Sequence, residues 1–519
     1  MSSLGIHKIK PQVILVGLYI LTNIWLVFQY GIYGDDRVLY NQTEEGIMQQ
    51  FYGNGSIYVG WMHVMMQQVS NPILLYRTII FIIGLCNVLL FLGIVNRIPV
   101  LKEISVSASI LFAVFPLGYS HMSMICFPYQ IGLLFQLCAM FAFVVHWNMQ
   151  KPYKFLWVVL YAVCQFLACA FLVSCGVICA VILAIAFWSV IPKKDIFVRD
   201  NIRKIGLEAL ILLLYFIPCL LFWWVRSRFF MPTGVYAAGN YNTFSLSHII
   251  HYPVNLLQSM GNSAEGFLMA MQDVVTWIPL LLIFIALFAG CYYVFRSDNL
   301  YDSQNKESKS RWALALVMYI AGITAYLLVG QIQKYNTLDD RHGILLTLSL
   351  PLITICIIKA CSQSSRVRRL LFSGCVVLFI CTSWNAYFEV FAEGQKNDAI
   401  VSYFQSTELP EGNVYIIDET DGFKCTDCAY WSSLYCMATG KQDRCFTLNG
   451  YPILTDSAHL TDMYFQKDAK AGAPTTCLYV YRDEAKFKKR VAKNILYYFL
   501  KPEKYKRQVS ETYLIDRVF

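Results

Sequence analysis

The chain has 519 residues, of which 57% are hydrophobic and only 14% are charged, and its formal net charge is +9. Soluble proteins carry about 25% charged residues, so this composition excludes a soluble protein and indicates an integral membrane protein. Of the 42 Lys and Arg residues, 19 lie in segments that we place on the cytoplasmic side, where membrane proteins concentrate them. The net charge therefore does not indicate nucleic-acid binding.

The first apolar run, residues 11–30, has no charged side chain and is long enough to cross a hydrocarbon core of about 30 Å. No small-x-small cleavage site follows it, which is typical of an uncleaved signal anchor. Gly34-Asp35-Asp36-Arg37 comes next, so we expect both carboxylates at the membrane surface. A carboxylate near the acyl region is costly to desolvate and suits a base. An acid pair that only solvates a helix end gives the same pattern.

Apolar runs of transmembrane length recur as far as residue 390. At about 1.5 Å per residue, stretches 104–147 and 155–191 are too long for one crossing, so each is expected to form a hairpin. The loop from residue 31 to about 72 is too polar to span. The other predicted spans are 72–96, 205–225, 275–296, 312–330, 343–361 and 370–390, which makes about eleven transmembrane helices.

The distribution of basic residues predicts the orientation of these spans. With the N-terminus inside, the cytoplasmic segments hold 19 Lys and Arg, and the outer segments before residue 391 hold six. This bias keeps its sign at every turn, as the positive-inside rule requires. The six outer cations are Arg37, Arg77, Arg226, Arg228, Lys334 and Arg341.

Residues 391–519 are polar and rich in turn signals. Residues 412–418 and 476–481 have strand character, 483–499 are typical of a helix, and 510–519 could form a last strand. The predicted fold is therefore an all-α polytopic membrane domain over 1–390 and a small extracytoplasmic α/β domain over 391–519. An odd number of spans places this second domain outside.

Five of the 18 cysteines lie in the second domain. Cys425 and Cys428 have the spacing of a zinc knuckle, but the other three do not repeat it, and His459 has no second histidine at ligand spacing. In a domain outside the cell, one or two disulfides are favoured over zinc. Their connectivity stays open among Cys425, Cys428, Cys436, Cys445 and Cys477.

A membrane-side acid pair with cations on the same face suggests a transferase that uses a lipid-borne donor. A carboxylate can take the proton from an acceptor hydroxyl, and Arg can hold the departing phosphate in a bidentate fork. The catalytic candidates are Asp35 and Asp36. The candidates for binding the substrate are Arg37, Arg77, Lys334, Arg341 and His342, although each taken singly is also typical of an interfacial anchor.

An inward N-terminus, an acid directly after the first span, about eleven spans and an outer C-terminal domain resemble the GT-C superfamily. These are multi-span glycosyltransferases that use polyprenyl-phosphate sugars. The stretch Gly34-Asp35-Asp36-Arg37 is also similar to that of bacterial O-antigen glucosyltransferase-like proteins. This resemblance implies a first-loop acid as base, a later outer cation (Lys334 or Arg341) on the donor phosphate, and a glycan or lipid-linked acceptor.

The same resemblance implies a place in the bacterial cytoplasmic membrane. We expect no cofactor. A divalent metal is not indicated, because the nearest candidate for a second acidic motif, Asp339-Asp340, does not have the Asp-x-Asp spacing of the oligosaccharyltransferase branch.

Three other functions fit parts of this pattern. A transporter or flippase would place charges or Gly/Pro breaks at mid-membrane, whereas the middles of these spans are nearly free of charge. An O-antigen polymerase or ligase would use a large outer loop, and the aromatic stretch 226–276 could be one, although it is also typical of a segment along the interface. A scaffold without activity would leave the acid pair unexplained.

Overall fold

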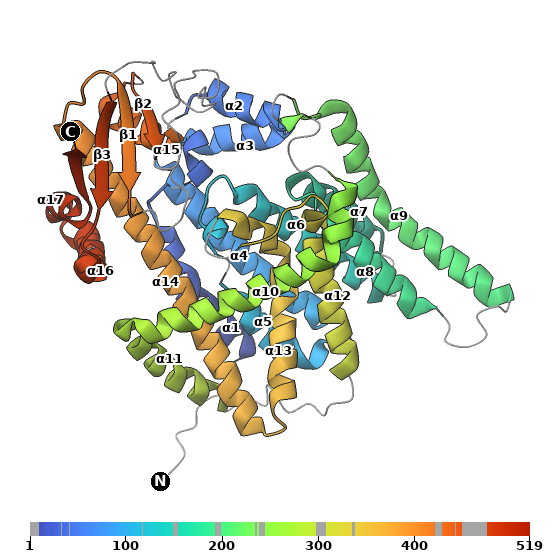
Figure 1. Cartoon of the computed structure of the whole chain (residues 1–519). Helices are drawn as coiled ribbons and strands as arrows, with labels where there is room; N and C mark the ends of the chain where they lie inside the picture. The colour runs from blue at the N-terminus through green and yellow to red at the C-terminus, as the bar shows by residue number, and fades with distance from the viewer. Residues whose placement is uncertain are drawn as a thin grey trace, which may run out of the picture.

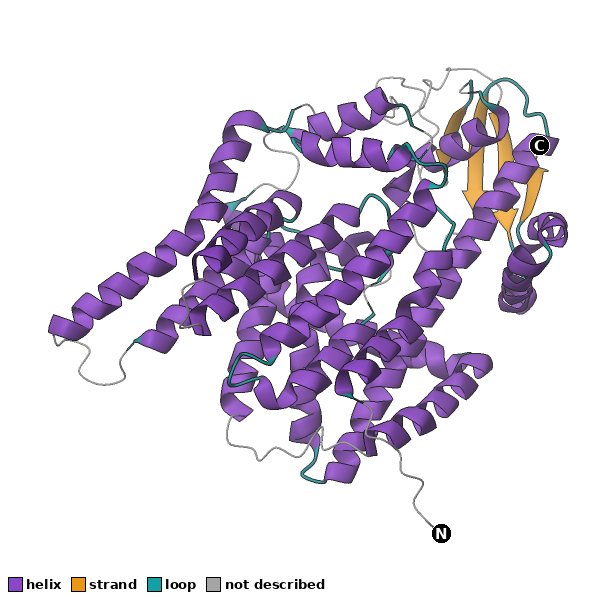
Figure 2. Cartoon of the chain, turned by 180° about the vertical axis from the view of Figure 1, so that it is seen from behind, coloured by secondary structure: helices purple, strands orange, loops and turns teal. Residues whose placement is uncertain are grey.

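The computed structural model describes residues 10–32, 34–40, 42–116, 118–148, 154–191, 199–233, 236–237, 244–296, 308–334, 338–420, 428–441, 443–448 and 475–518. A bundle of helices forms most of the molecule, and a small sheet with its own helices lies at one end (Figure 1). Figure 2 shows from behind that the described strands are all gathered in this second part.

The first half of the bundle contains helices from residue 11 to residue 190. Several begin where local chemistry favours a start: Pro11 and Pro72 occupy the first helical turn, and the side chain of Asn71 accepts a hydrogen bond from the amide of Leu74. The helices are α1 (Pro11–Asn23), η1 (Ile24–Phe28), η2 (Gly34–Val38), α2 (Glu44–Gly53), α3 (Ile57–Gln67), α4 (Pro72–Val95), η3 (Lys102–Ile104), α5 (Ser105–Val114), η4 (Tyr119–His121), α6 (Phe127–Asn148), α7 (Lys154–Phe171) and α8 (Cys175–Val190).

The second half of the bundle contains longer helices. Among them α10 begins at a capped residue, because the Ser245 side chain accepts a hydrogen bond from the amide of His248. The helices are α9 (Arg199–Phe229), α10 (Leu246–Thr276), α11 (Ile278–Arg296), α12 (Ser308–Leu327), η6 (Leu338–Leu348), α13 (Leu350–Cys361) and α14 (Ser365–Ser406).

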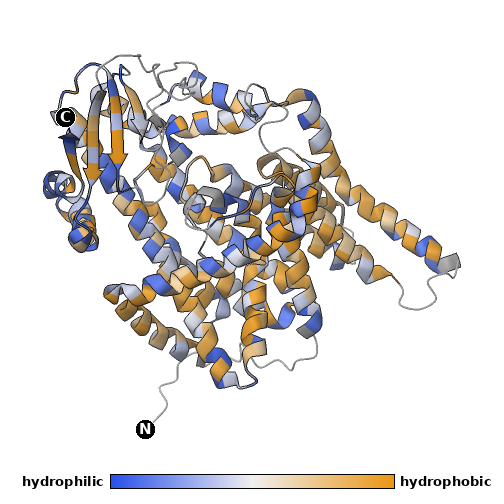
Figure 3. Cartoon of the chain, in the orientation of Figure 1, coloured by the Kyte–Doolittle hydropathy of each residue, from blue (hydrophilic) through white to orange (hydrophobic). Residues whose placement is uncertain are grey.

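Seven helices of the described residues are long and apolar enough to cross a membrane. They are α1 together with η1, α4, α6, α9, α11, α12 and α14. An eighth crossing is formed if η6 and α13, which meet at an angle of 60°, are one broken span. Hydrophobic residues predominate along these helices (Figure 3), and the length and number of the helices indicate an integral, multi-pass membrane protein.

All the stretches predicted to span are helical, but three of them are shorter than the sequence suggested. Helix α5 has 10 residues, α7 has 18 and α8 has 16. The stretch 104–147 therefore forms a short and a long helix rather than two full crossings. The reason lies between them, where Pro116 and the positive φ of Gly118 (75°) interrupt the helix.

The outer segments that were expected to be loops are partly helical. Helices α2 and α3 occupy the first loop, and α10 occupies most of the aromatic stretch after α9. Helix α10 crosses the bundle against α12 and α14 (Figure 1) and is not among the helices of the described chain that are apolar enough to span. Its 31 residues thus form a long amphipathic helix.

Helix α14 connects the two parts of the molecule. Its 42 residues run past residue 390 without a break and end at Ser406 in the second domain. The buried residues near its end include Ile400 and Phe404, which pack in the core of that domain. The predicted boundary at residue 390 therefore falls within a continuous helix.

The second domain is a four-stranded mixed sheet with the strand order β2-β1-β3-β4. The central strand β1 is parallel to β2 and β3, and β4 is antiparallel to β3. The predicted strands and helix are present, and the small α/β domain is confirmed. The elements are β1 (Asn413–Asp418), α15 (Cys428–Thr439), β2 (Cys445–Leu448), β3 (Thr475–Tyr481), α16 (Glu484–Leu500), α17 (Pro502–Thr512) and β4 (Leu514–Val518).

The disulfide prediction stays untested. It depends on Cys425 and on the side chain of Cys428, which lie outside the described residues, as does His459.

Candidate functional site

The backbone that leads to the acid pair is packed against α14. A side-chain carbon added to Gly31 would lie 3.0 Å from the Cα of Gly394, so the two backbones can approach this closely only because both residues are glycine. The Asn397 side chain also donates a hydrogen bond of 2.7 Å to the carbonyl of Ile32. The start of η2 is therefore held by α14.

Asp36 points into the protein and has no exposed surface. Its Oδ1 accepts hydrogen bonds from Ser123 Oγ at 2.6 Å and from the amide of Ile125 at 2.9 Å. Its Oδ2 is buried and makes no hydrogen bond within the described structure. Burial raises the pKa of the Asp36 carboxyl above its ordinary value, and the charge of Arg77 opposes this shift.

A second buried acid, Asp340, contacts the chain three residues before Ser123. Asp340, at the start of η6, accepts a hydrogen bond of 3.0 Å from the amide of Ser120. A side-chain carbon on Gly118 would lie 1.9 Å from Asp340 Oδ2, and Gly118 has a φ of 75°. Only glycine fits there. We call residues 118–125 the clamped turn, because Asp36 and Asp340 fasten it at its two ends.

The other acid of the pair faces outward. The Asp35 side chain is 54% exposed, and its Oδ2 lies 3.5 Å from Nη1 of Arg341, whose side chain is 19% exposed. This long contact joins the loop that follows the first span to η6. Because Arg341 follows Asp340 directly, the surface pair lies one residue from the acid that holds the clamped turn.

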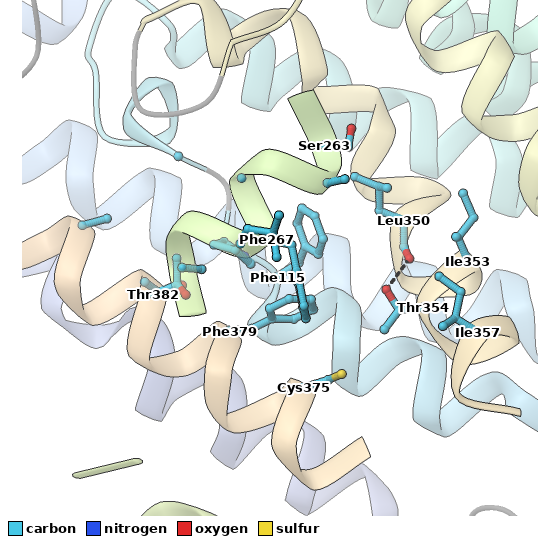
Figure 4. Close-up of a pocket in the computed structure, with 18 of the residues that line it drawn as sticks. Phe115, Ser263, Phe267, Leu350, Ile353, Thr354, Ile357, Cys375, Phe379 and Thr382 are labelled. Atoms are coloured by element: carbon cyan, nitrogen blue, oxygen red, sulfur yellow. Dashed lines mark hydrogen bonds between the residues drawn. The ribbon is translucent and has the colours of Figure 1, made fainter. Parts of the chain in front are cut away.

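A cavity of about 650 Å³ lies against the clamped turn, which contributes three residues, Gly118, His121 and Met122, to its wall. Figure 4 shows its side chains coming from α10, α13, α14 and the end of α5. The labelled side chains in the picture are mostly apolar, including Phe115, Phe267 and Phe379. A cavity of this kind suits a hydrocarbon chain.

Most polar side chains in the cavity wall already have partners. Asn23 donates to the carbonyl of Ala113 and accepts from the Tyr387 hydroxyl at 2.9 Å, and Ser263 pairs with Tyr319 at 3.1 Å. These pairs rigidify the wall and leave it apolar in character.

His121 is the polar exception in this wall. It is 3% exposed, and neither ring nitrogen makes a hydrogen bond of good geometry, although Gln130 lies near it. Burial, with a smaller effect from the Arg77 charge, lowers the pKa of His121 to about 4. The imidazole is therefore neutral at physiological pH and can accept or donate a hydrogen bond without carrying charge.

The predicted substrate-binding residues are placed differently from one another. Arg77 is completely buried beside Asp36 and donates to the carbonyl of Gly31 at 3.3 Å. His342 is 6% exposed, and its ring lies 4.8 Å from that of Tyr326. Both thus lie behind the surface pair of Asp35 and Arg341 rather than beside it.

Arg37 and Lys334 lie outside this cluster. The Arg37 guanidinium stacks 3.4 Å from the ring centre of Tyr430 on α15, and donates to Asn397 Oδ1 at 3.4 Å. It therefore joins the first loop to the second domain. Lys334 is exposed and follows Gln333, whose side chain bonds Ser259 of α10.

Sequence reasoning missed the clamped turn as part of the site. Its residues were interpreted only as the break in an apolar hairpin, and Asp340 only as half of a metal motif. The available signal was the run of polar residues Tyr119-Ser120-His121 within 44 apolar residues. The side chain of Asp339 lies outside the described residues, and elsewhere in the described chain no three His, Cys, Asp or Glu side chains gather to hold a metal ion.

No protein-family model and no curated protein matches this sequence. Among solved structures, the chain is similar to the archaeal oligosaccharyltransferase AglB from Archaeoglobus fulgidus in complex with an inhibitory peptide and a dolichol-phosphate. The identity is 12%, the TM-score is 0.44, and the match covers 90% of this chain and 69% of that chain.

The chain is also similar to ArnT from Cupriavidus metallidurans bound to undecaprenyl phosphate, with 11% identity, a TM-score of 0.35, and coverage of 92% of this chain and 93% of that chain. The same protein in the apo state gives 10% identity, a TM-score of 0.35 and the same coverage. With values this low, the function of this chain is inferred below from its own residues.

Proposed function

We propose that this protein is a GT-C-type membrane glycosyltransferase that moves a sugar from a polyprenyl-phosphate donor to a hydroxyl acceptor at the extracytoplasmic membrane face. The observation that carries the proposal is the Asp35–Arg341 pair. It places a carboxylate that solvent and substrate can reach beside a cation, one residue from the acid that holds the wall of an apolar cavity.

The difference in exposure between the two acids supports Asp35 as the base. Asp35 is 54% exposed, so an acceptor hydroxyl can reach its carboxylate, whereas Asp36 has no exposed surface. Asp36 instead positions the clamped turn through Ser123 and Ile125. Of the two acids that the sequence left open, Asp35 is thus the catalytic residue and Asp36 is a positioning residue.

The transfer would proceed in one displacement. Asp35 takes the proton of the acceptor hydroxyl, and the oxygen of that hydroxyl forms a bond to the anomeric carbon of the sugar. The bond from that carbon to the phosphate oxygen breaks, and the phosphate leaves with the electron pair. Arg341 stabilises the negative charge that the phosphate gains. Its contact with Asp35 is long, at 3.5 Å, so a phosphate group can replace it.

The cavity would hold the first part of the donor's lipid chain. Its volume of about 650 Å³ and its apolar wall match a hydrocarbon, and His121 of the clamped turn is a buried polar residue in the same wall. A neutral imidazole there could donate a hydrogen bond to a phosphate oxygen without adding charge.

The test is sugar transfer from labelled polyprenyl-phosphate hexoses by the full chain in reconstituted membranes. Asp35→Asn should lower kcat by about 10²- to 10⁴-fold, as expected for loss of a general base, with little change in KM. Arg341→Met should lower kcat and raise KM together. Glu408→Gln, which changes an exposed acid outside the site, is the matched control and should retain full activity.

Full activity of Asp35→Asn would overturn the assignment of the base. A transporter or flippase makes a different prediction: vesicles would move labelled lipid across the bilayer while transferring no sugar. That result would overturn the transferase itself.

A further inference from the structure

Helices α16 and α17 carry a strong positive charge that the proposed reaction does not use. Between Glu484 and Thr512 there are nine Lys and Arg and three Glu. The basic residues are Lys486, Lys488, Lys489, Arg490, Lys493, Lys501, Lys504, Lys506 and Arg507. Within the described part of the chain, Lys489, Lys493 and Lys501 form no salt bridge. Their charge is available to a partner.

The last turns of α16 expose large apolar side chains on the same face. Leu496 is 60% exposed, Phe499 is 45% exposed and Leu500 is 73% exposed. In an α-helix, residues three and four positions apart are neighbours, so Lys489, Lys493, Leu496 and Leu500 follow one another along one face. This face is basic in its first half and apolar in its second.

Two contacts set the height of α16 relative to the bilayer. The ring of Phe499 packs edge-on against Phe28, with 5.6 Å between their centres, and Phe28 is the last residue of the first span. The Lys488 ammonium lies 5.0 Å from the ring centre of Trp277, the residue before the span of α11. Both contacts place α16 level with the ends of two spans.

The apolar patch on α16 is continuous with the exposed apolar surface of η1, at the end of the first span. Phe28 is 43% exposed and Trp25, one turn earlier, is 44% exposed. Aromatic side chains at the end of a span are typical of the membrane–water interface. Figures 1 and 2 agree that α16 lies at the end of the sheet nearest the bundle.

We propose that the exposed face of α16 lies on the membrane surface and binds anionic phospholipid headgroups. Leu496, Phe499 and Leu500 enter the boundary between headgroups and acyl chains, while Lys489, Lys493 and Lys501 contact the phosphates. An amphipathic helix with this division of charged and apolar residues is the physical form of an interfacial anchor. A soluble polyanion would fit the lysines but would leave the three apolar side chains in water.

The proposal goes beyond the reaction and does not depend on it. Helix α14 and the contact of Arg37 with Tyr430 already tie the second domain to the bundle. Binding of α16 to the lipid surface adds an attachment to the bilayer itself, which fixes the tilt of the domain above the site.

The test uses the full chain in nanodiscs with a photo-crosslinking benzoylphenylalanine at position 500. The matched control carries the same group at Glu411, which is exposed and lies two residues before β1. Strand β1 begins at the end of the sheet away from α16 (Figure 1). Mass spectrometry should find at least about fivefold more lipid adducts at position 500. Phosphatidylglycerol discs should give more adducts than phosphatidylcholine discs.

Two variants separate the contribution of the lysine charges from that of the apolar side chains. Lys489→Gln/Lys493→Gln/Lys501→Gln should abolish the preference for phosphatidylglycerol but keep the melting temperature, because these side chains are exposed and form no salt bridge in the described chain. Leu496→Ser should lower the adduct yield at position 500 in both lipids. Equal yields at positions 500 and 411, no dependence on headgroup charge, or adducts mainly to a second copy of the protein would each overturn the proposal.

Discussion

The two sides of the short helix η2 differ in what they bind, although their charges are adjacent in the sequence. Asp36 faces the bundle, where it holds Ser123 and Ile125 near the charge of Arg77. Arg37 faces the second domain, where it stacks on Tyr430 and bonds Asn397. Asp36 thus contacts the clamped turn of the candidate site, and Arg37 connects the same short helix to the second domain.

This difference shows that the role of a charged residue after a membrane span depends on the residues that surround it. Both residues are more than 95% buried, and both were candidates for contact with the substrate. In the structure Asp36 contacts the clamped turn, and Arg37 contacts the second domain. The variants below test whether that division is real.

The largest expected effect is on the bundle side. Asp36→Ala leaves the Ser123 hydroxyl and the Ile125 amide without their acceptor and removes the counter-charge of Arg77. Breaking a buried charge pair costs about 3–5 kcal/mol, so the free energy of unfolding and the transfer rate should both fall sharply. Asp36→Asn keeps an acceptor oxygen and should lose less. Equal stability of wild type and Asp36→Ala, measured by thermal unfolding in detergent, would contradict this prediction.

The next effect is expected at the other end of the clamped turn. Gly118→Ala places a side-chain carbon against Asp340 Oδ2 and imposes a positive φ on alanine. The strained backbone alone costs about 1–3 kcal/mol, and the clash must displace Asp340. The melting temperature should fall, and kcat should fall roughly tenfold as Arg341 moves. Gly17→Ala, whose added carbon meets nothing within 4 Å, is the matched control and should behave as wild type.

A smaller effect is expected on the side of the second domain. Arg37→Met and Tyr430→Leu each remove the stacked pair, whose interaction is worth about 0.5–2 kcal/mol. A double-mutant cycle on the free energy of unfolding should return a coupling of that size. Activity should fall only a few-fold, because Tyr430 and Asn397 engage the Arg37 guanidinium in the contact between the first loop and the second domain. A loss of kcat as large as that of Asp35→Asn would return Arg37 to the substrate-binding residues.

The smallest effect concerns pH. Burial raises the pKa of Asp36 in the folded protein above its unfolded value. The folded state thus binds the proton more tightly, so this carboxyl favours folding most at pH values below its unfolded pKa and less as the pH rises through its folded pKa. The melting temperature of Asp36→Asn relative to wild type should therefore rise between pH 4 and pH 7. A difference that is independent of pH would show that Asp36 is not buried in this way.

Local patterns of the sequence determined much of the architecture. The length of the apolar runs predicted α4, α6, α9 and α11, because crossing a hydrocarbon core depends only on residues that are adjacent in the chain. The strand β1 and the helix α16 were also predicted from local signals, which are strand character after a turn signal for β1 and helix character for α16. The short helix α15 and the strand β2 were not predicted, because their local sequence signals are weaker.

Only the tertiary structure decided how the outer segments meet. Ser123 reaches Asp36 across 87 positions, and Ser120 reaches Asp340 across 220 positions. Hydropathy carries no information about which loops are neighbours once the chain has crossed the membrane several times. The sequence by itself therefore determined that Asp35 and Asp36 follow the first apolar run, whereas packing decided that Asp35 is exposed beside Arg341 and Asp36 is buried beside Arg77.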